Sequence, residues 1–238
     1  MNDTRSLIIN ADDFGLSPGV DEGVIVAHER GIVSSASLMV RWPAAVEAAL
    51  SARDHPELGL GLHIDLGEQE YRDGAWLCVY QVVDLKDQSA VADEVARQLD
   101  AFRRLVGRNP THLDSHQHVH RKEPVKSILI ERARALAVPL RHFSPSVGYR
   151  GDFYGQTATG VALPGAVSAE RLIAVLKSLT PGITELGCHP GLRCDLVSNY
   201  NRERAEEGKA LCDPRVRETV AAEGIILRNF SGLLSRAG

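Results

Sequence analysis

The sequence predicts an α/β fold, an irregular (β/α) TIM-like barrel that forms a single domain over residues 1–238. Short apolar runs alternate with segments of helical periodicity along the whole chain, which is the pattern of a parallel sheet covered by helices. About seven of these runs qualify as strands, and 238 residues is a common length for such a barrel. No linker or strong internal repeat divides the chain. A doubly wound open sheet is the alternative architecture.

The expected strands are mostly continuous apolar runs, as in sheets that are buried on both faces. The first run leads into Asp12-Asp13-Phe14-Gly15, and the third is broken by Gly59 and Gly61. In chain order the runs are Leu7–Ala11, Ser35–Val40, Leu58–Ile64, a strand opened by Thr111, Pro139–Phe143, Glu185–Cys188 and Ile225–Leu227.

The expected helices carry apolar residues at helical spacing between these strands. Pro18 stands near the start of the first helix and Gly31 follows its end, as the preferences of helix termini require. The helices are a segment from Pro18 to just before Gly31, then Ala44–Arg53, Val91–Val106, Val125–Leu136, Leu172–Leu179 and Arg202–Glu223. Weak periodicity at Asp65–Gln88 and Ser144–Val167 predicts two long loops.

Charge and composition exclude several classes of protein. The net charge of −4 and the pI near 6.1 give no general attraction to nucleic acid or to acidic membranes. No apolar run is long enough to span a bilayer, so no integral membrane segment is expected. The four cysteines form no CxxC pair, and they are interpreted as reduced thiols of a cytoplasmic protein.

Residues 111–120, Thr-His-Leu-Asp-Ser-His-Gln-His-Val-His, contain four of the nine histidines of the chain. Neutral imidazole is a common ligand of transition metals, and a neighbouring carboxylate is a typical partner or co-ligand. The segment is internal and interleaved with Leu and Val, unlike an expression tag. A metal or catalytic role is therefore favoured over a histidine-rich surface turn.

Ionisable residues also follow four predicted strands at the points where the strands end, and Arg141 and His142 lie on a fifth. Active sites gather at the carboxyl ends of strands in barrels and in open α/β sheets, so these side chains are expected to meet at one face. They are Asp12 and Asp13, His63 and Asp65, Asp114 and His116, Arg141 and His142, and His189.

The adjacent carboxylates Asp12 and Asp13 have two interpretations. They could form an Asx turn or a helix N-cap. Alternatively, one binds a metal while the other accepts a proton, which is the division that metal-assisted hydrolysis requires. His63 is either a core histidine or a ligand, and His189 is either a turn residue or a general acid.

Other polar residues are expected to be structural or exposed. His28 and His55 are interpreted as surface residues, and His112 as structural. The run Arg202–Glu207 is expected to be a solvated helix face with favourable i,i+4 pairs.

Taken together, these motifs resemble the YdjC-like carbohydrate deacetylase family. The match includes Asn10–Ser17, Gly31–Ser37, Gly61–His63, Thr111–His120, Cys188–Gly191 and Tyr200–Arg204. The sequences of Ala27–Gly31 and Ser35–Val40 also resemble those of the subgroup associated with hopanoid biosynthesis. The segment around Tyr71–Ser89, which commonly helps to shape the substrate groove, looks shorter than in many relatives.

The resemblance implies a distorted (β/α) barrel and removal of acetyl groups from N-acetylated amino sugars. It further implies one divalent metal ion held by Asp13, His63 and His116, with Asp12 as the base and His189 as the general acid. Mg or Zn is expected first, and Mn, Co, Ni or Fe are alternatives. Asp114, His118, His120 and Arg141 are expected to contact the substrate or to support the ligands.

Two alternatives remain open from the sequence. One is another metal-dependent hydrolase on the same barrel, such as a phosphoesterase. The other is a metal-binding or sugar-binding protein without catalysis, although such a site has no need for a spare base beside its ligand. The oligomeric state is open too, and a homodimer is the default expectation because such dimers are the commonest soluble oligomers.

Overall fold

The computed structural model describes residues 3–193 and 195–234. Its main sheet has the order β6-β3-β2-β1-β8-β7, and every pairing in it is parallel. These strands are β6 (Leu113–Ser115), β3 (Gly59–Ile64), β2 (Ser35–Leu38), β1 (Arg5–Phe14), β8 (Gly182–Cys188) and β7 (Gly148–Arg150). The α/β prediction is confirmed, in the form of a distorted half-barrel.

The central strand β1 explains how the sheet is distorted. Its residues Leu7, Ile8 and Ile9 are fully buried, and β8 pairs with it from Arg5 to Ala11. The opposite edge of β1 is shared, because β9 (Ile226–Leu227) pairs near its start while β2 pairs from Asn10 onward. A strand that changes partner along its length bends the sheet toward the shape of a barrel.

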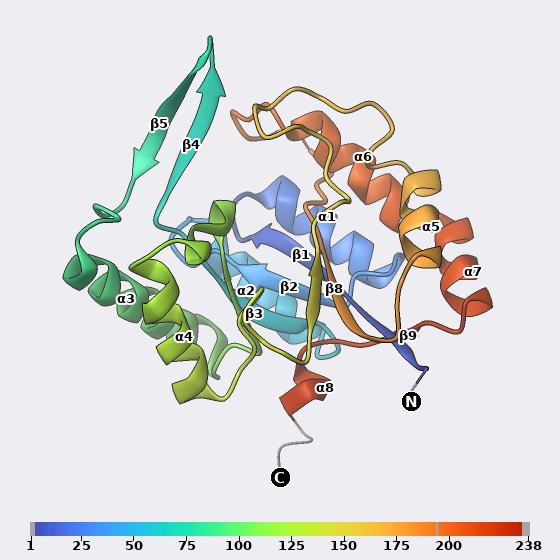
Figure 1. The fold of residues 1–238 in the computed structure, drawn as a ribbon, viewed down its shortest axis with the longest axis horizontal. Helices are drawn as coiled ribbons and strands as arrows, with labels where there is room; N and C mark the ends of the chain where they lie inside the picture. Colours follow the sequence, from blue (N-terminus) through green and yellow to red (C-terminus); the bar gives the residue numbers. More distant parts are fainter. Residues whose placement is uncertain (1–2, 194, 235–238) are drawn as a thin grey trace.

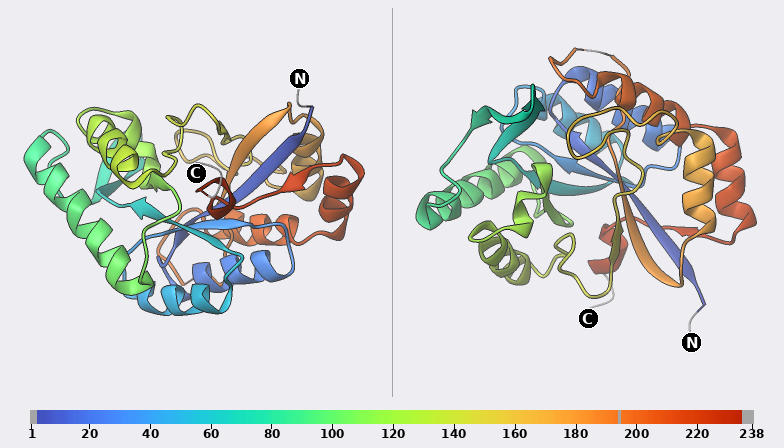
Figure 2. Two further views of the ribbon diagram at one scale, coloured as in Figure 1. Left: turned by 90° about the horizontal axis from the view of Figure 1, so that it is seen from below. Right: turned by 45° about the horizontal axis from the view of Figure 1, so that its top comes forward.

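Helices lie around the outside of this sheet, with α3 and α4 on one side and α5 to α7 on the other (Figures 1 and 2). They are α1 (Pro18–Glu29), α2 (Ala45–Asp54), α3 (Gln88–Val106), α4 (Val125–Leu136), α5 (Ala169–Lys177), α6 (Asn201–Leu211), α7 (Pro214–Ala222) and the short α8 (Ser231–Leu234). The first begins as predicted, with Ser17 Oγ accepting from Val20 N–H and Pro18 in the first turn.

The prediction of one long loop over Asp65–Gln88 is wrong. The segment forms an antiparallel hairpin of β4 (Gly67–Arg72) and β5 (Ala75–Gln81), which projects from the body of the molecule (Figure 1). Its two-residue turn is Asp73-Gly74, and both residues have positive φ, at 51° and 85°. Asp-Gly is a strong signal for such a hairpin turn, but the strands are largely exposed and carry no apolar periodicity.

Three other boundaries differ from the prediction. The helix expected over Arg202–Glu223 is two helices, because Asp213 caps α7 and Pro214 opens it. Pro139–Phe143 makes only one bridge, between Leu140 and Leu113, and β7 lies instead in the expected loop. The strand expected to open at Thr111 begins at Leu113 and includes Asp114, and the 3-10 helix η1 (His116–Arg121) follows it.

Two further expectations concern cysteines and membranes. Cys78, Cys188 and Cys212 are free thiols, as predicted, whereas Cys194 lies outside the described residues. Among the described helices, none combines the length and apolar character needed to cross a bilayer.

Candidate active site

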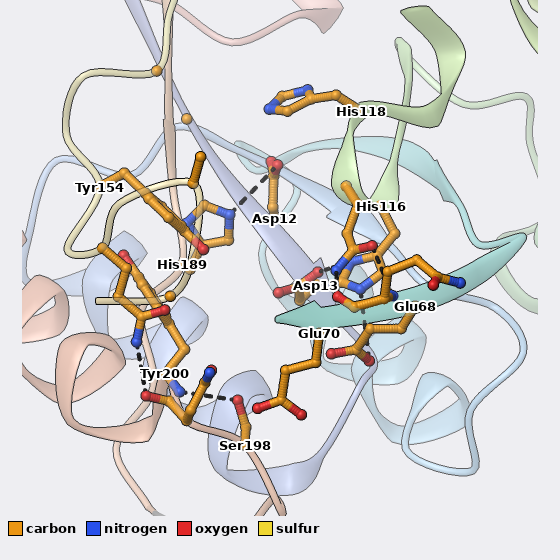
Figure 3. Close-up of a pocket in the computed structure, with 18 of the residues that line it drawn as sticks. Asp12, Asp13, Glu68, Glu70, His116, His118, Tyr154, His189, Ser198 and Tyr200 are labelled. Atoms are coloured by element: carbon orange, nitrogen blue, oxygen red, sulfur yellow. Dashed lines mark hydrogen bonds and ion pairs between the residues drawn. The ribbon is translucent and has the colours of Figure 1, made fainter. Parts of the chain in front are cut away.

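A cavity of about 350 Å³ opens where the strands β1, β3, β6 and β8 end, beneath the β4–β5 hairpin. It gathers predicted residues from four separate parts of the chain (Figure 3). Those that line it are Asp12, Asp13, His63, His116, His118 and His189. The expected convergence of strand-end residues is therefore present for this set.

Asp12 and Asp13 reach the cavity together because β1 is irregular at its end. Successive side chains of a regular strand point to opposite faces. Here the register with β2 shifts between Ala11 and Phe14, and Asp13 takes a left-handed backbone with φ 63°. A non-glycine residue in that region is uncommon and is found at functional sites.

Asp13 faces both predicted histidine ligands with one oxygen. Its Oδ1 lies 3.4 Å from His63 Nε2 and 3.1 Å from His116 Nδ1. Its other oxygen, Oδ2, accepts a hydrogen bond from Arg204 Nη2 at 2.6 Å. Burial opposes ionisation of Asp13, but Arg204 and the two imidazoles hold the pKa of this carboxyl well below its ordinary value.

The donor set of Asp13, His63 and His116 fits a divalent ion. One carboxylate oxygen and two imidazole nitrogens lie within 4.8 Å of one another. His116 Nε2 is buried without a hydrogen-bond partner among the described residues, while its Nδ1 faces the carboxylate. Two imidazoles and a carboxylate with room for further ligands suit Zn and other first-row metals, and the carboxylate also admits Mg.

The far side of His63 is held by a second carboxylate. Its Nδ1 donates to Asp114 Oδ1 at 2.7 Å, which fixes the ring and leaves Nε2 toward Asp13. This is the usual support of a metal-binding histidine. Burial works against a charged imidazole, yet Asp114 and Asp13 raise the pKa of His63 to about 10, and Asp13 and Glu68 raise that of His116 to about 9. The same negative groups favour a cation in the space between them.

Asp12 is clamped from behind by Arg141. Two guanidinium nitrogens donate to its two carboxylate oxygens, Nη1 to Oδ2 at 2.6 Å and Nη2 to Oδ1 at 2.7 Å. Asn10 Nδ2 adds a bond to Oδ1 at 2.8 Å. Burial would raise the pKa of Asp12, but Arg141 holds it below the ordinary value. Asp12 is therefore ionised at neutral pH and fixed in direction.

Arg141 itself is buried and does not line the cavity. It also contacts Asp114 and Glu185, so one guanidinium neutralises part of a buried cluster of carboxylates. In this position the Arg141 side chain holds Asp12 in place and cannot contact a substrate in the cavity. Of the two roles expected for Arg141, the geometry favours the supporting one.

His189 lies beside Asp12 at the wall of the cavity (Figure 3). Its Nε2 lies 3.9 Å from Asp12 Oδ2, and its Nδ1 lies 3.8 Å from Glu207 Oε1. Its ring packs edge-on against Tyr154 and Tyr200, and Tyr200 Oη donates to Glu207 Oε1 at 2.6 Å. The imidazole is thus fixed at the wall of the cavity with Nε2 toward Asp12.

Other predicted residues lie further from this centre. His118 lines the cavity and lies 3.5 Å from Tyr149 Oη through its Nε2. His120 is fully buried and bonds Ser115 Oγ at 2.6 Å. Asp65 does not join the site, because its carboxylate accepts bonds from Arg41, Trp42 and Tyr80 at the base of the hairpin.

The structural role expected for His112 is confirmed. Its ring stacks on Phe230, with centroids 3.9 Å apart, and its Nε2 lies 3.0 Å from Ser37 Oγ, which in turn donates to Asp114 Oδ2 at 2.7 Å. A Cβ at Gly61 would lie 2.4 Å from this ring, so only glycine fits there. The glycine in β3 thereby allows the packing that holds Asp114 behind His63.

The expectation of a solvated face at Arg202–Glu207 is wrong for part of the run. Arg202 and Glu206 form the exposed i,i+4 pair. Arg204, however, is buried and pairs with Asp13, and the buried Glu207 accepts a hydrogen bond from the backbone N–H of His189. Tyr200, Glu203, Arg204 and Glu207 recur at helical spacing, so they share the face of α6 that is turned inward. That spacing is the sequence signal for these residues.

Comparison with known proteins places this geometry in a family. The sequence model of the YdjC-like proteins matches residues 6–222. A carbohydrate deacetylase of Geobacillus stearothermophilus is 35% identical over 247 residues, covering 95% of this chain and 97% of the relative. A chitooligosaccharide deacetylase of Serratia marcescens is 31% identical over 252 residues, covering 96% of this chain and 99% of the relative.

A solved structure agrees with the sequence comparisons. It is a protein of Enterococcus faecalis V583 that is named for cellobiose-phosphate cleavage. Its chain is 27% identical and superposes with a TM-score of 0.78, covering 97% of this chain and 99% of that one. The irregular β1 with its paired carboxylates thus stands within a known fold, and the chain belongs to the YdjC-like family.

Proposed function

We propose that this protein is a metal-dependent hydrolase that removes the N-acetyl group from an acetylated amino sugar. The observation that carries the proposal is the pairing of two adjacent carboxylates with different partners. Asp13 faces His63 and His116, whereas Asp12 is held by Arg141 outside that set and faces His189. A site that only binds a metal has no need for the second carboxylate. The names of the curated relatives support the same activity.

Each residue then has a defined task. Asp13, His63 and His116 would hold the divalent ion. When bound, such an ion supplies a Lewis acid that makes water a stronger acid and polarises the acetyl carbonyl. Asp12 accepts the proton of the attacking water, and Arg141 keeps Asp12 ionised and aimed at the cavity.

His189 serves the leaving nitrogen. An amide anion leaves poorly, so the nitrogen of the sugar must receive a proton before the C–N bond breaks. His189 Nε2 lies on the opposite wall from the metal-binding set and within 3.9 Å of Asp12 Oδ2. Glu207 accepts the backbone N–H of His189 and holds the residue in this direction. In this proposal Asp12 accepts the proton of the attacking water and His189 donates a proton to the leaving nitrogen.

The hairpin supplies the sugar-binding surface in this proposal. Tyr71 and Trp76 form an edge-to-face pair near its tip, 5.5 Å between centroids, and both line the cavity. Tyr154 and Tyr200 stack on the opposite wall at 4.7 Å. Aromatic walls with a few polar groups between them suit the apolar faces and hydroxyl edges of a sugar. We propose that the substrate extends from the carboxylates toward Trp76.

Several narrower assignments remain proposals or predictions. Residues 1–238 are proposed to form a single YdjC-like domain, because β9 returns to pair with β1 after the segment matched by the family. The identity of the metal, a homodimeric state, residence in the cytoplasm and membership of the hopanoid-associated subgroup stay predictions.

An acetate-release screen tests the proposal. Purified protein is stripped with a chelator, reloaded with Mg²⁺, Zn²⁺, Mn²⁺, Co²⁺ or Ni²⁺, and mixed with N-acetylglucosamine oligomers or acetylated glycolipid-like sugars. We expect acetate from at least one pair of metal and sugar, and none from stripped protein. No acetate from any pair would reject the proposal in favour of a binding protein. Release of phosphate from sugar phosphates without acetate would favour a phosphoesterase.

A further inference from the structure

Three histidines outside the set around Asp13 face one another beside the cavity. They are His118 and His120 of η1 and His142 of the segment that follows Leu140. Their ring centroids form a nearly equilateral triangle with sides of 5.7, 5.3 and 5.5 Å. One nitrogen of each ring lies within 4.8 Å of the others. A tetrahedral ion with bonds of about 2.0–2.1 Å needs nitrogens about 3.4 Å apart. Ion binding therefore requires the nitrogens to approach one another by at most about 1.4 Å.

Two ring nitrogens of these histidines are buried without a hydrogen-bond partner among the described residues. His118 Nδ1 and His120 Nε2 have no hydrogen-bond partner among the described residues, and His120 is fully buried. Buried polar atoms are rarely left unpaired, because the loss of water is then uncompensated. An atom that no protein group satisfies is an indication of a missing ligand.

The opposite nitrogens of the same two rings do have partners. His120 Nδ1 lies 2.6 Å from Ser115 Oγ, and His118 Nε2 lies 3.5 Å from Tyr149 Oη. Hydroxyl oxygens that accept from one ring nitrogen leave the lone pair of the other nitrogen free. Metal-binding histidines are held in this way by a second set of partners.

We propose that His118, His120 and His142 form a second metal site that takes Zn²⁺ or a similar late first-row ion. Three neutral imidazoles suit such ions, whereas Mg²⁺ and Ca²⁺ require oxygen ligands. Asp12, His63 and Asp114 also lie close enough together to hold an ion. They are not proposed as a metal site, because both carboxylates already pair with the guanidinium of Arg141.

The surrounding charge and access are compatible with a cation. Two arginines act on the triangle: Arg141 is buried but paired with Asp12, Asp114 and Glu185, whereas Arg121 is exposed to solvent, which screens its charge. His142 is exposed and His118 lines the cavity, which gives an ion two routes of approach.

The second ion would link η1 to the segment around His142. Among the described residues no strand pairing joins η1 to the segment around His142; the single Leu113–Leu140 bridge joins that segment to β6 instead. Both His118 and His142 pack on Tyr149, with centroids 5.5 and 4.6 Å apart, and Tyr149 lines the cavity. Binding at the triangle would fix this wall of the site.

Metal stoichiometry tests the proposal. Chelator-stripped full-length protein is titrated with Zn²⁺ in competition with a chromophoric chelator. We expect two equivalents for the unaltered chain, one for His142→Ala and one for Asp13→Asn. The control His55→Gln removes an imidazole outside both sets and should retain two. Circular dichroism of each variant checks that it is folded.

Two results would overturn the proposal: saturation of the unaltered chain at one equivalent, or retention of two by folded His142→Ala. A second measurement uses Asp13→Asn alone. Zn²⁺ should raise its Tm, whereas the same concentration of Mg²⁺ should not; equal responses would contradict a three-imidazole site. Neither measurement depends on acetate release, so this proposal and the proposed activity can fail separately.

Discussion

Arg204 donates a 2.6 Å hydrogen bond to Oδ2 of Asp13, and this contact leaves Oδ1 of the same carboxylate facing His63 and His116. The arginine comes from α6, late in the chain, whereas Asp13 ends the first strand. Its charge lowers the pKa of Asp13 despite burial. Arg204 is thus a positioning residue for the proposed metal ligand.

Replacing Arg204 should weaken metal binding without removing any ligand. In Arg204→Met the carboxylate of Asp13 is free to rotate, and we expect the metal affinity to fall about 10–100-fold, as for other supporting partners of metal ligands. Competition titration with a chelator measures this. Arg202→Met, two residues away on the exposed face of α6, is the control and should bind metal like the unaltered chain. Equal affinities in both variants would contradict the role of Arg204.

Glu207 and Glu206 offer a matched pair of adjacent residues. Glu207 is buried and accepts the backbone N–H of His189 and the hydroxyl of Tyr200, whereas Glu206 pairs with Arg202 at the surface. Glu207→Gln should lower kcat about 10-fold with little change in KM, because the general acid is displaced while the sugar surface is intact. Glu206→Gln should change neither constant. A fall in kcat/KM caused only by KM would assign Glu207 to substrate binding instead.

Arg204 and Glu207 are the residues of the site that the sequence-based prediction missed. Asp12, Asp13, His63 and His189 were predicted for the site because each follows an apolar strand, and strand ends converge in such a fold. Arg204 and Glu207 lie on a helix whose run of charges is also typical of a solvated face. Their helical spacing groups Arg204 and Glu207 on one face, but it does not show that this face is the buried one. The contacts with Asp13 and His189 show that, and the contact of Arg204 with Asp13 joins residues 191 positions apart.

Local turn chemistry explains the other differences. Asp73-Gly74 encodes the hairpin turn, but its strands have no buried face and so lack the period that predicts strands. Asp213-Pro214 is a helix start inside an otherwise helical run. In the stretch after Ser115, Gln117 and His118 take positive φ within the 3-10 helix η1, and no apolar pattern in the sequence encodes that conformation.

Trp76 tests the proposed sugar surface. Trp76→Ala removes the exposed indole at the hairpin while leaving the carboxylates untouched. One lost aromatic contact corresponds to about 0.5–1.5 kcal/mol, so KM for longer oligosaccharides should rise about 2–13-fold with kcat unchanged. Val79→Ala, an exposed residue of the same strand that does not line the cavity, is the control. An unchanged KM for every chain length would remove the hairpin from the binding surface.

Replacing the buried Asp21 with Asn should stabilise the folded protein in a pH-dependent way. Burial raises the pKa of this carboxyl to about 7, and its Oδ2 has no hydrogen-bond partner among the described residues. The folded protein therefore binds the proton more tightly than the unfolded chain, and its stability falls as pH rises from about 4 through about 7.

Asp21→Asn keeps an acceptor for the N–H of Gly15 and carries no charge at any pH. At pH 8 it should be more stable than the unaltered chain by about 2–4 kcal/mol, since one pKa unit equals about 1.36 kcal/mol. At pH 4 the two should be equal. Urea unfolding at both values measures the difference, with the exposed Glu22→Gln as control. A gain of the same size at both pH values would contradict the linkage.

The most direct test of the proposed chemistry is Asp12→Asn, assayed for metal content and acetate release in the same preparation. Asn keeps an oxygen for Arg141 but accepts no proton, and Asp12 stands outside the proposed ligand set. We expect the variant to retain its metal while acetate release falls at least about 100-fold, the usual contribution of a general base. Retention of both the metal and the full rate of release would contradict Asp12 as the base.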